Sequence, residues 1–80
     1  MELRELRRLR NKYLPGTLIM LVHMEDIQAP PSGTKGRVEF VDDIGQIHIK
    51  WENGSSLALI DGVDMFRVLE YGDENYDNGN

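Results

Sequence analysis

The amino-acid sequence predicts a small, mainly β domain that follows one short amphipathic helix. The clearest signal is the alternation of apolar and polar residues over 46–51, where Ile47, Ile49 and Trp51 share a face, as in a half-buried strand. Asn53-Gly54 comes next, and both residues tolerate the positive φ of a tight hairpin turn. The 80 residues are enough for one domain with a small core.

Residues 2–13 are predicted to form the helix. Acidic residues lie in the first turns and basic residues in the later ones, an order that complements the helix dipole. Pro15-Gly16 ends the segment. Spacings of three and four place four apolar side chains on one face: Leu3, Leu6, Leu9 and Tyr13.

The apolar face of this helix needs cover, because twelve residues are marginal for an isolated helix. A second apolar face is expected on the first strand, formed by Leu18, Met20 and Val22. We favour docking of the helix on its own domain, with those three residues as the expected contact. Pairing of the two faces between chains is the alternative, so the chain is expected to be a monomer or a homodimer.

The other elements follow in an order that suggests a specific architecture. The sequence predicts a strand at 17–24, a long loop at 25–36, a strand at 37–41, a turn at 42–45, a strand at 46–51, a hairpin turn at 53–54, a strand at 55–59, one helical or 3₁₀ turn at 60–64 and a strand at 65–69. This is the serial order of a small five-stranded SH3-like barrel, whose closure removes exposed sheet edges. The main competitor is the OB fold, but its strands are usually longer.

The alternation along these strands predicts the domain boundaries and the core. Residues 1–14 form the helical segment, 15–71 the SH3-like barrel and 72–80 a disordered acidic tail. The expected core residues are Ile19, Leu21, Val38, Phe40, Ile47, Ile49, Trp51, Leu57, Leu59 and Phe66.

Composition excludes several classes of protein. Without cysteine, the chain has neither disulfides nor thiolate metal sites. No apolar run approaches the roughly 18 residues of a membrane span, and no secretory signal begins the sequence, so we expect a cytoplasmic protein without membrane contact. The net charge of −5 combines a basic segment at 1–12 with an acidic remainder, which disfavours nucleic-acid binding by the body of the domain.

The sequence offers no convincing catalytic or metal-binding group. His48 alternates with apolar neighbours and should point outward, and neither it nor His23 has a predicted nucleophile and orienting partner. Asp42 and Asp43 are adjacent on an exposed turn, which does not supply the apolar surroundings of an acid–base pair. We therefore expect a non-enzymatic protein without catalytic residues, metal or cofactor.

Several short motifs resemble a known family. They are the segments 15–17, 30–36, 41–48, 51–57 and 60–64, which occur in order at the expected spacing. Together they resemble domain-of-unknown-function family 4314, a group of small bacterial and phage proteins, over residues 1–69. The resemblance implies an SH3-like barrel and an origin on a phage or mobile element, and it carries no catalytic residue set.

The leading functional hypothesis is a protein-binding module, in which an acidic surface could meet a basic partner such as a host defence complex. In an SH3-like barrel the long loop, the turn at 42–45 and the turn at 60–64 are expected to converge on one side. Ile27 and Ile44 are apolar residues in polar loops, and they anchor either the loop or a partner. The candidate binding residues are Ile27, Pro30, Pro31, Asp42, Asp43, Ile44, Asp61 and Asp64.

The alternative hypothesis is a nucleic-acid accessory domain that resembles KOW-type barrels. Its contacts to phosphate would come from the basic helix. The residues concerned are Arg4, Arg7, Arg8, Arg10 and Lys12.

Overall fold

The computed structural model describes residues 1–73, which form one helix and five strands. The elements in chain order are α1 (Leu3–Lys12), β1 (Leu18–His23), β2 (Lys35–Val41), β3 (Gln46–Trp51), β4 (Leu59–Ile60) and β5 (Met65–Glu70). The prediction of a mainly β fold with one short N-terminal helix is confirmed. Within the described part, no helix is long and apolar enough to cross a membrane.

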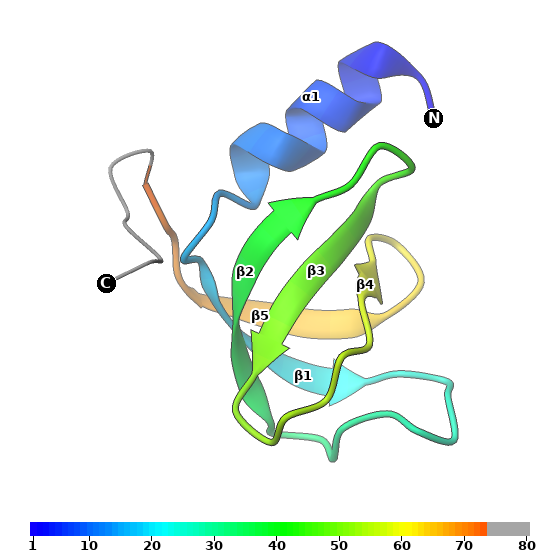
Figure 1. Cartoon of the computed structure of the whole chain (residues 1–80), viewed down its shortest axis with the longest axis vertical. Coiled ribbons are helices and arrows are strands. Elements are labelled where there is room, and N and C mark those ends of the chain that lie inside the picture. Colours follow the sequence, from blue (N-terminus) through cyan, green and yellow to red (C-terminus); the bar gives the residue numbers. More distant parts are fainter. Residues whose placement is uncertain (74–80) are drawn as a thin grey trace.

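The five strands form one antiparallel sheet in the order β4-β3-β2-β1-β5. The sheet is strongly curved: β2 and β3 rise steeply, and β1 and β5 cross behind them (Figure 1). The sheet is nevertheless open, because β4 and β5 are its two edges and do not pair with each other. The prediction that closure removes the exposed edges is therefore wrong.

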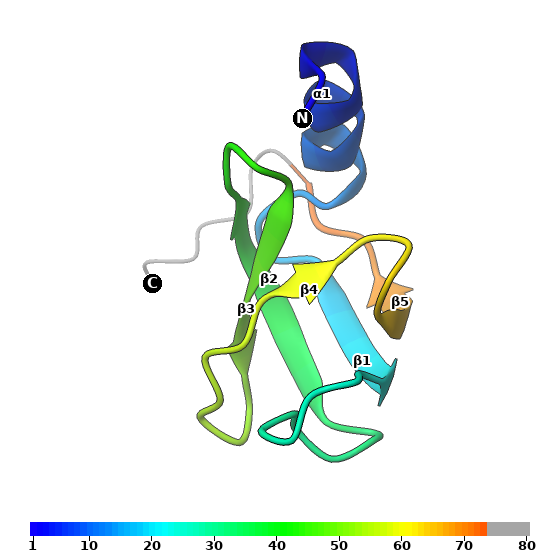
Figure 2. The ribbon, with the colours of Figure 1, turned by 90° about the vertical axis from the view of Figure 1, so that its right-hand side faces the viewer.

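The helix packs over one end of the curved sheet (Figure 2). Leu6, Leu9 and Tyr13 are buried in the same cluster as the inward side chains of the strands, whereas Leu3 is 59% exposed. Docking of the helix on its own domain is confirmed, but the expected contact is wrong. The buried side of the helix packs into the same inner core as Ile19. The expected contact residues Leu18, Met20 and Val22 lie on the outer face of β1 and are half-buried.

The core contains most of the expected strand residues, but Leu57 is only half-buried and outside the core cluster, and Phe40 is exposed. Phe40 was predicted to point inward and is 51% exposed. The pairing of β2 with β3 shifts register between Val38 and Phe40, so that Glu39 and Phe40 both face outward and Val41 turns inward. A β-bulge of this kind reverses the alternation downstream of it.

The hairpin predicted after β3 is wider than expected. The turn at Asn53-Gly54 is present, and the Gly54 amide donates to the Trp51 carbonyl. The predicted strand at 55–59 is wrong, since β4 contains only Leu59 and Ile60. The indole Nε1 of Trp51 donates to the Leu57 carbonyl at 2.7 Å, which holds this carbonyl in a loop.

The segments that follow β4 and β5 are tied to the rest of the domain. The Asp64 amide donates to the Ile60 carbonyl at 3.0 Å, but Gly62 has a φ of 82°, so residues 60–64 form a hydrogen-bonded turn and the predicted helical turn is wrong. After β5, the Gly72 amide donates to the buried hydroxyl of Thr17 at 3.0 Å. Most of the predicted tail, residues 74–80, lies outside the described residues.

Candidate functional site

The loops that were predicted to converge lie at two separate places. The long loop with Ile27, Pro30 and Pro31 lies at the end of the sheet away from α1, while the turn at 42–45 lies beside α1 (Figures 1 and 2). The expected convergence is wrong because β2 runs from the long loop at one of its ends to this turn at the other. Pro30 is buried, and Ile27 is fully exposed.

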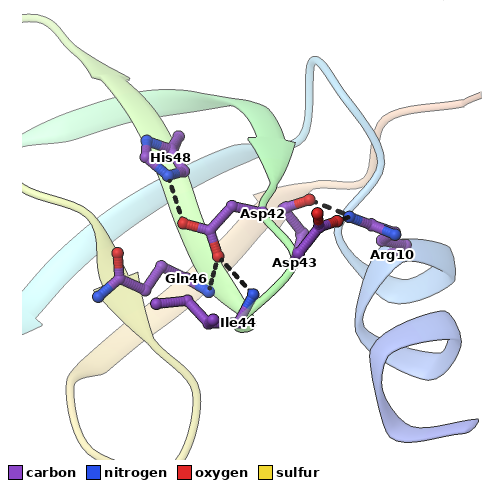
Figure 3. A network of polar contacts seen from close by, with 7 residues as sticks. Arg10, Asp42, Asp43, Ile44, Gln46 and His48 are labelled. Atoms are coloured by element: carbon purple, nitrogen blue, oxygen red, sulfur yellow. Dashed lines mark hydrogen bonds and ion pairs between the residues drawn. The ribbon is translucent and has the colours of Figure 1, made fainter. Parts of the chain in front are cut away.

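Asp42 organises the turn between β2 and β3 (Figure 3). Its Oδ1 accepts from the amides of Ile44 and Gln46 at 3.1 and 2.9 Å, and its Oδ2 lies 2.8 Å from Nε2 of His48. The contact with His48 is the main reason that the pKa of Asp42 lies below its usual value; partial burial opposes this effect, and the two amides add to it. Asp42 therefore holds the turn together.

Two of the acidic candidates are engaged by two of the basic candidates. Arg10 on α1 reaches Oδ1 of Asp43 at 2.9 Å, and its Nε donates to a backbone carbonyl at the end of β2 (Figure 3). Arg8 lies 3.7 Å from Oδ2 of Asp61. Exposed ion pairs of this kind contribute about 0–1 kcal/mol each, so their main effect is to orient α1.

Asp61 also connects the turn at 60–64 to the core. Its Oδ1 accepts from the Tyr13 hydroxyl at 3.1 Å. Burial, and then the nearby carboxylate of Asp61, raise the pKa of Tyr13 to about 12. The last acidic candidate, Asp64, accepts from the Ile60 amide at 2.8 Å. All four aspartates proposed from the sequence thus form contacts within the domain, Asp42 and Asp64 with nearby residues and Asp43 and Asp61 with α1 or its C-cap.

Three of the basic candidates remain without an ion pair inside residues 1–73. Arg4 and Arg7 are exposed on α1 and form no salt bridge to a described residue. The ammonium of Lys12 lies 5.3 Å from the centre of the Tyr13 ring, as in a cation–π contact. The basic surface predicted from the sequence is therefore smaller than the count of five suggests.

Ile27 and Ile44 do not anchor their loops onto the sheet. They are 102% and 67% exposed. Ile44 lines a small hollow of about 140 Å³ together with Met1 and Ile60. Gly45 lies beneath Met1 with φ of 86°, and a β-carbon there would collide with the methionine side chain. The prediction that these two isoleucines anchor their loops is therefore wrong, and their contact with a partner stays a prediction.

The outer face of β2 and β3 carries an exposed aromatic pair that sequence reasoning missed. The rings of Phe40 and His48 stack 4.3 Å apart and nearly parallel, at 8°. The pair exists because the bulge turns Phe40 outward, and no local sequence signal marks that bulge.

A groove of about 640 Å³ lies along β5, and the sequence did not predict it. Its lining residues are Lys12, Tyr13, Val22, Asp61, Asp64, Met65, Phe66, Arg67, Val68 and Tyr71. Four of these are consecutive on β5. Successive side chains of a strand point to opposite faces, so a groove lined by four in a row follows the edge of the strand.

Potential metal ligands do not cluster among the described residues. Among residues 1–73, no three His, Asp or Glu side chains are placed to hold a metal ion. His23 and His48 each contact one carboxylate, Glu25 and Asp42. The buried hydroxyls of Thr17 and Thr34 donate to nearby backbone carbonyls.

The model of one protein family, described as a domain of unknown function, DUF4314, matches residues 2–69. The chain belongs to this family. The match includes α1, β1 to β4 and all of β5 but its last residue, so it covers the turns and every lining residue of the groove except Tyr71. No curated protein and no solved structure matches the chain. The family description assigns no activity.

Proposed function

We propose that the chain is a non-enzymatic protein-binding module with the architecture of an SH3-like barrel. The observation that carries the proposal is the groove along the unpaired edge of β5. The architecture is supported by the strand order, in which four strands form a meander and the fifth returns to pair with the first.

The edge of β5 is suited to binding another chain. An edge strand presents a row of unpaired backbone N–H and C=O groups, which an extended segment of a partner can pair with. β5 has six residues, whereas β4, the other edge, has only two. Its outward side chains include Met65 and Leu69, which are 59% and 45% exposed. Length, exposed apolar side chains and the adjoining groove together favour β5.

The alternative of nucleic-acid binding by α1 has less support. Arg8 and Arg10 are paired with aspartates, and the net charge of the chain is −5. A gel-shift titration tests this alternative, because binding that depends on phosphate contacts must weaken steeply as salt concentration rises.

The test of the main proposal is affinity capture with matched variants. The phage or mobile-element origin implied by the family resemblance suggests a bacterial lysate as the source of partners. Met65→Lys with Leu69→Lys places two charges on the edge of β5. Ile27→Lys with Ile44→Lys is the control, since it makes the same change at two exposed positions on the loops. Circular dichroism verifies that both variants fold.

We expect a protein that is captured by the wild type and by the loop variant (Ile27→Lys with Ile44→Lys). The same protein should not be captured by the β5 variant (Met65→Lys with Leu69→Lys). A protein lost only with the loop variant would place function on the loops predicted from the sequence. Equal capture by all three chains would show that neither surface binds it.

A further inference from the structure

We propose that the partner segment adds to β5 as a strand that places a carboxylate opposite Arg67, between two apolar side chains opposite Met65 and Leu69. This inference rests on the proposed function and specifies the chemistry of the partner.

The outer face of β5 defines the pattern. Met65, Arg67 and Leu69 are exposed and alternate with the half-buried Phe66 and Val68. Side chains directly opposite each other on neighbouring strands lie on the same face and interact most strongly. On this face, a strand added at the edge therefore meets three side chains at intervals of two residues: apolar Met65, cationic Arg67 and apolar Leu69.

Arg67 has no carboxylate partner among the residues that the structure describes. Arg67 forms no ion pair with any other residue among 1–73, and its partner in register on β1 is Met20. The two carboxylates that line the groove are already engaged, Asp61 by Tyr13 and Arg8, and Asp64 by a backbone amide. With both groove carboxylates engaged, a carboxylate from another molecule can complement the charge of Arg67.

A second copy of this chain fits the edge poorly. Two β5 strands paired about a two-fold axis at Arg67 would match Met65 with Leu69 and Phe66 with Val68, which are compatible pairs. The same arrangement places Arg67 directly opposite Arg67, and like charges in that position are destabilising. A charged residue in the middle of an edge strand is a common way of preventing self-association. The occupant is therefore a different chain that carries an acidic residue.

The test uses two synthetic peptides, acetyl-Ser-Ile-Thr-Glu-Thr-Val-Ser-amide and the same sequence with Lys in place of Glu. Fluorescence anisotropy of labelled peptides gives the affinities, and backbone amide shifts in NMR spectra locate the binding. The wild type should bind the Glu peptide about threefold or more tightly than the Lys peptide, with shifts on β5. Arg67→Glu should reverse the preference. Lys50→Glu, with the same charge change at an exposed position on β3, should not.

The outcomes separate this inference from the function on which it rests. Shifts on β5 with equal affinity for both peptides, or an unchanged preference in Arg67→Glu, would overturn the role of Arg67 and leave the binding edge standing. No shifts on β5 with either peptide would overturn strand addition, while the capture experiment still decides whether the chain binds a protein. Shifts on β5 that change on dilution without peptide would identify a second copy as the occupant.

Discussion

Leu9→Ala tests whether α1 is an integral part of the core. Leu9 is 1% exposed and is among the largest fully buried side chains of the domain. Removing a buried leucine side chain costs about 2–5 kcal/mol, through lost transfer free energy and the cavity that remains. A domain of 80 residues has a total stability of about 4–12 kcal/mol. The substitution should therefore lower the melting temperature by roughly 10–30 °C.

Leu3→Ala is the matched control on the same helix. It makes the same chemical change, but Leu3 is 59% exposed, so the substitution should cost less than about 0.5 kcal/mol. Urea unfolding can be followed by the fluorescence of Trp51, the single tryptophan, which is buried on the strands. If the two variants unfold at the same urea concentration, α1 does not contribute to the core and the docking described above is incorrect.

Three further predictions concern the bulge and the two perturbed acids. Phe40→Ala should destabilise the domain less than Val41→Ala, because only Val41 is buried; urea unfolding that showed the reverse would contradict the bulge. Because the pKa of Asp42 is lowered in the folded state, its ionised carboxylate stabilises the fold at pH values above the unfolded-state pKa of 3.8. This contribution is lost as the pH falls through the lower folded-state pKa. Asp42→Asn should therefore be less stable than the wild type at pH 7, with a difference that shrinks below about pH 4 in acid unfolding curves. The raised pKa of Tyr13 means that the folded state loses stability as pH rises from about 10 towards 12. Ultraviolet titration should show a phenol with a pKa of about 12 that is absent in Tyr13→Phe. If the two titration curves were the same, the burial of Tyr13 beside a carboxylate would be refuted.

Local periodicity was enough to predict the helix and the central strand. The spacing of Leu6, Leu9 and Tyr13 identified the face of α1 that is buried, and the alternation over Gln46–Trp51 gave β3 its correct register. Both signals depend on neighbours within a few residues, and tertiary packing did not override them.

The candidate site could not be predicted in the same way, because it depends on contacts between distant segments. The groove exists because β5 pairs with β1 and leaves its other edge free. The contact between Arg10 and Asp43 joins residues 33 positions apart in the sequence, and the hydrogen bond between Tyr13 and Asp61 joins residues 48 positions apart. A sequence shows that these residues are charged or polar, but not that they neutralise one another.

The pairing of β1 with β5 has a consequence for the synthesis of the protein. The strands β2, β3 and β4 are joined through neighbours in sequence, but Leu18 pairs with Glu70. Contacts between such distant residues form slowly, because a long loop must close before they are gained. A chain emerging from the ribosome can build the meander early, but it exposes Ile19 and Leu21 on β1 until β5 has followed. The last strand to be translated is thus the one that protects the first from aggregation.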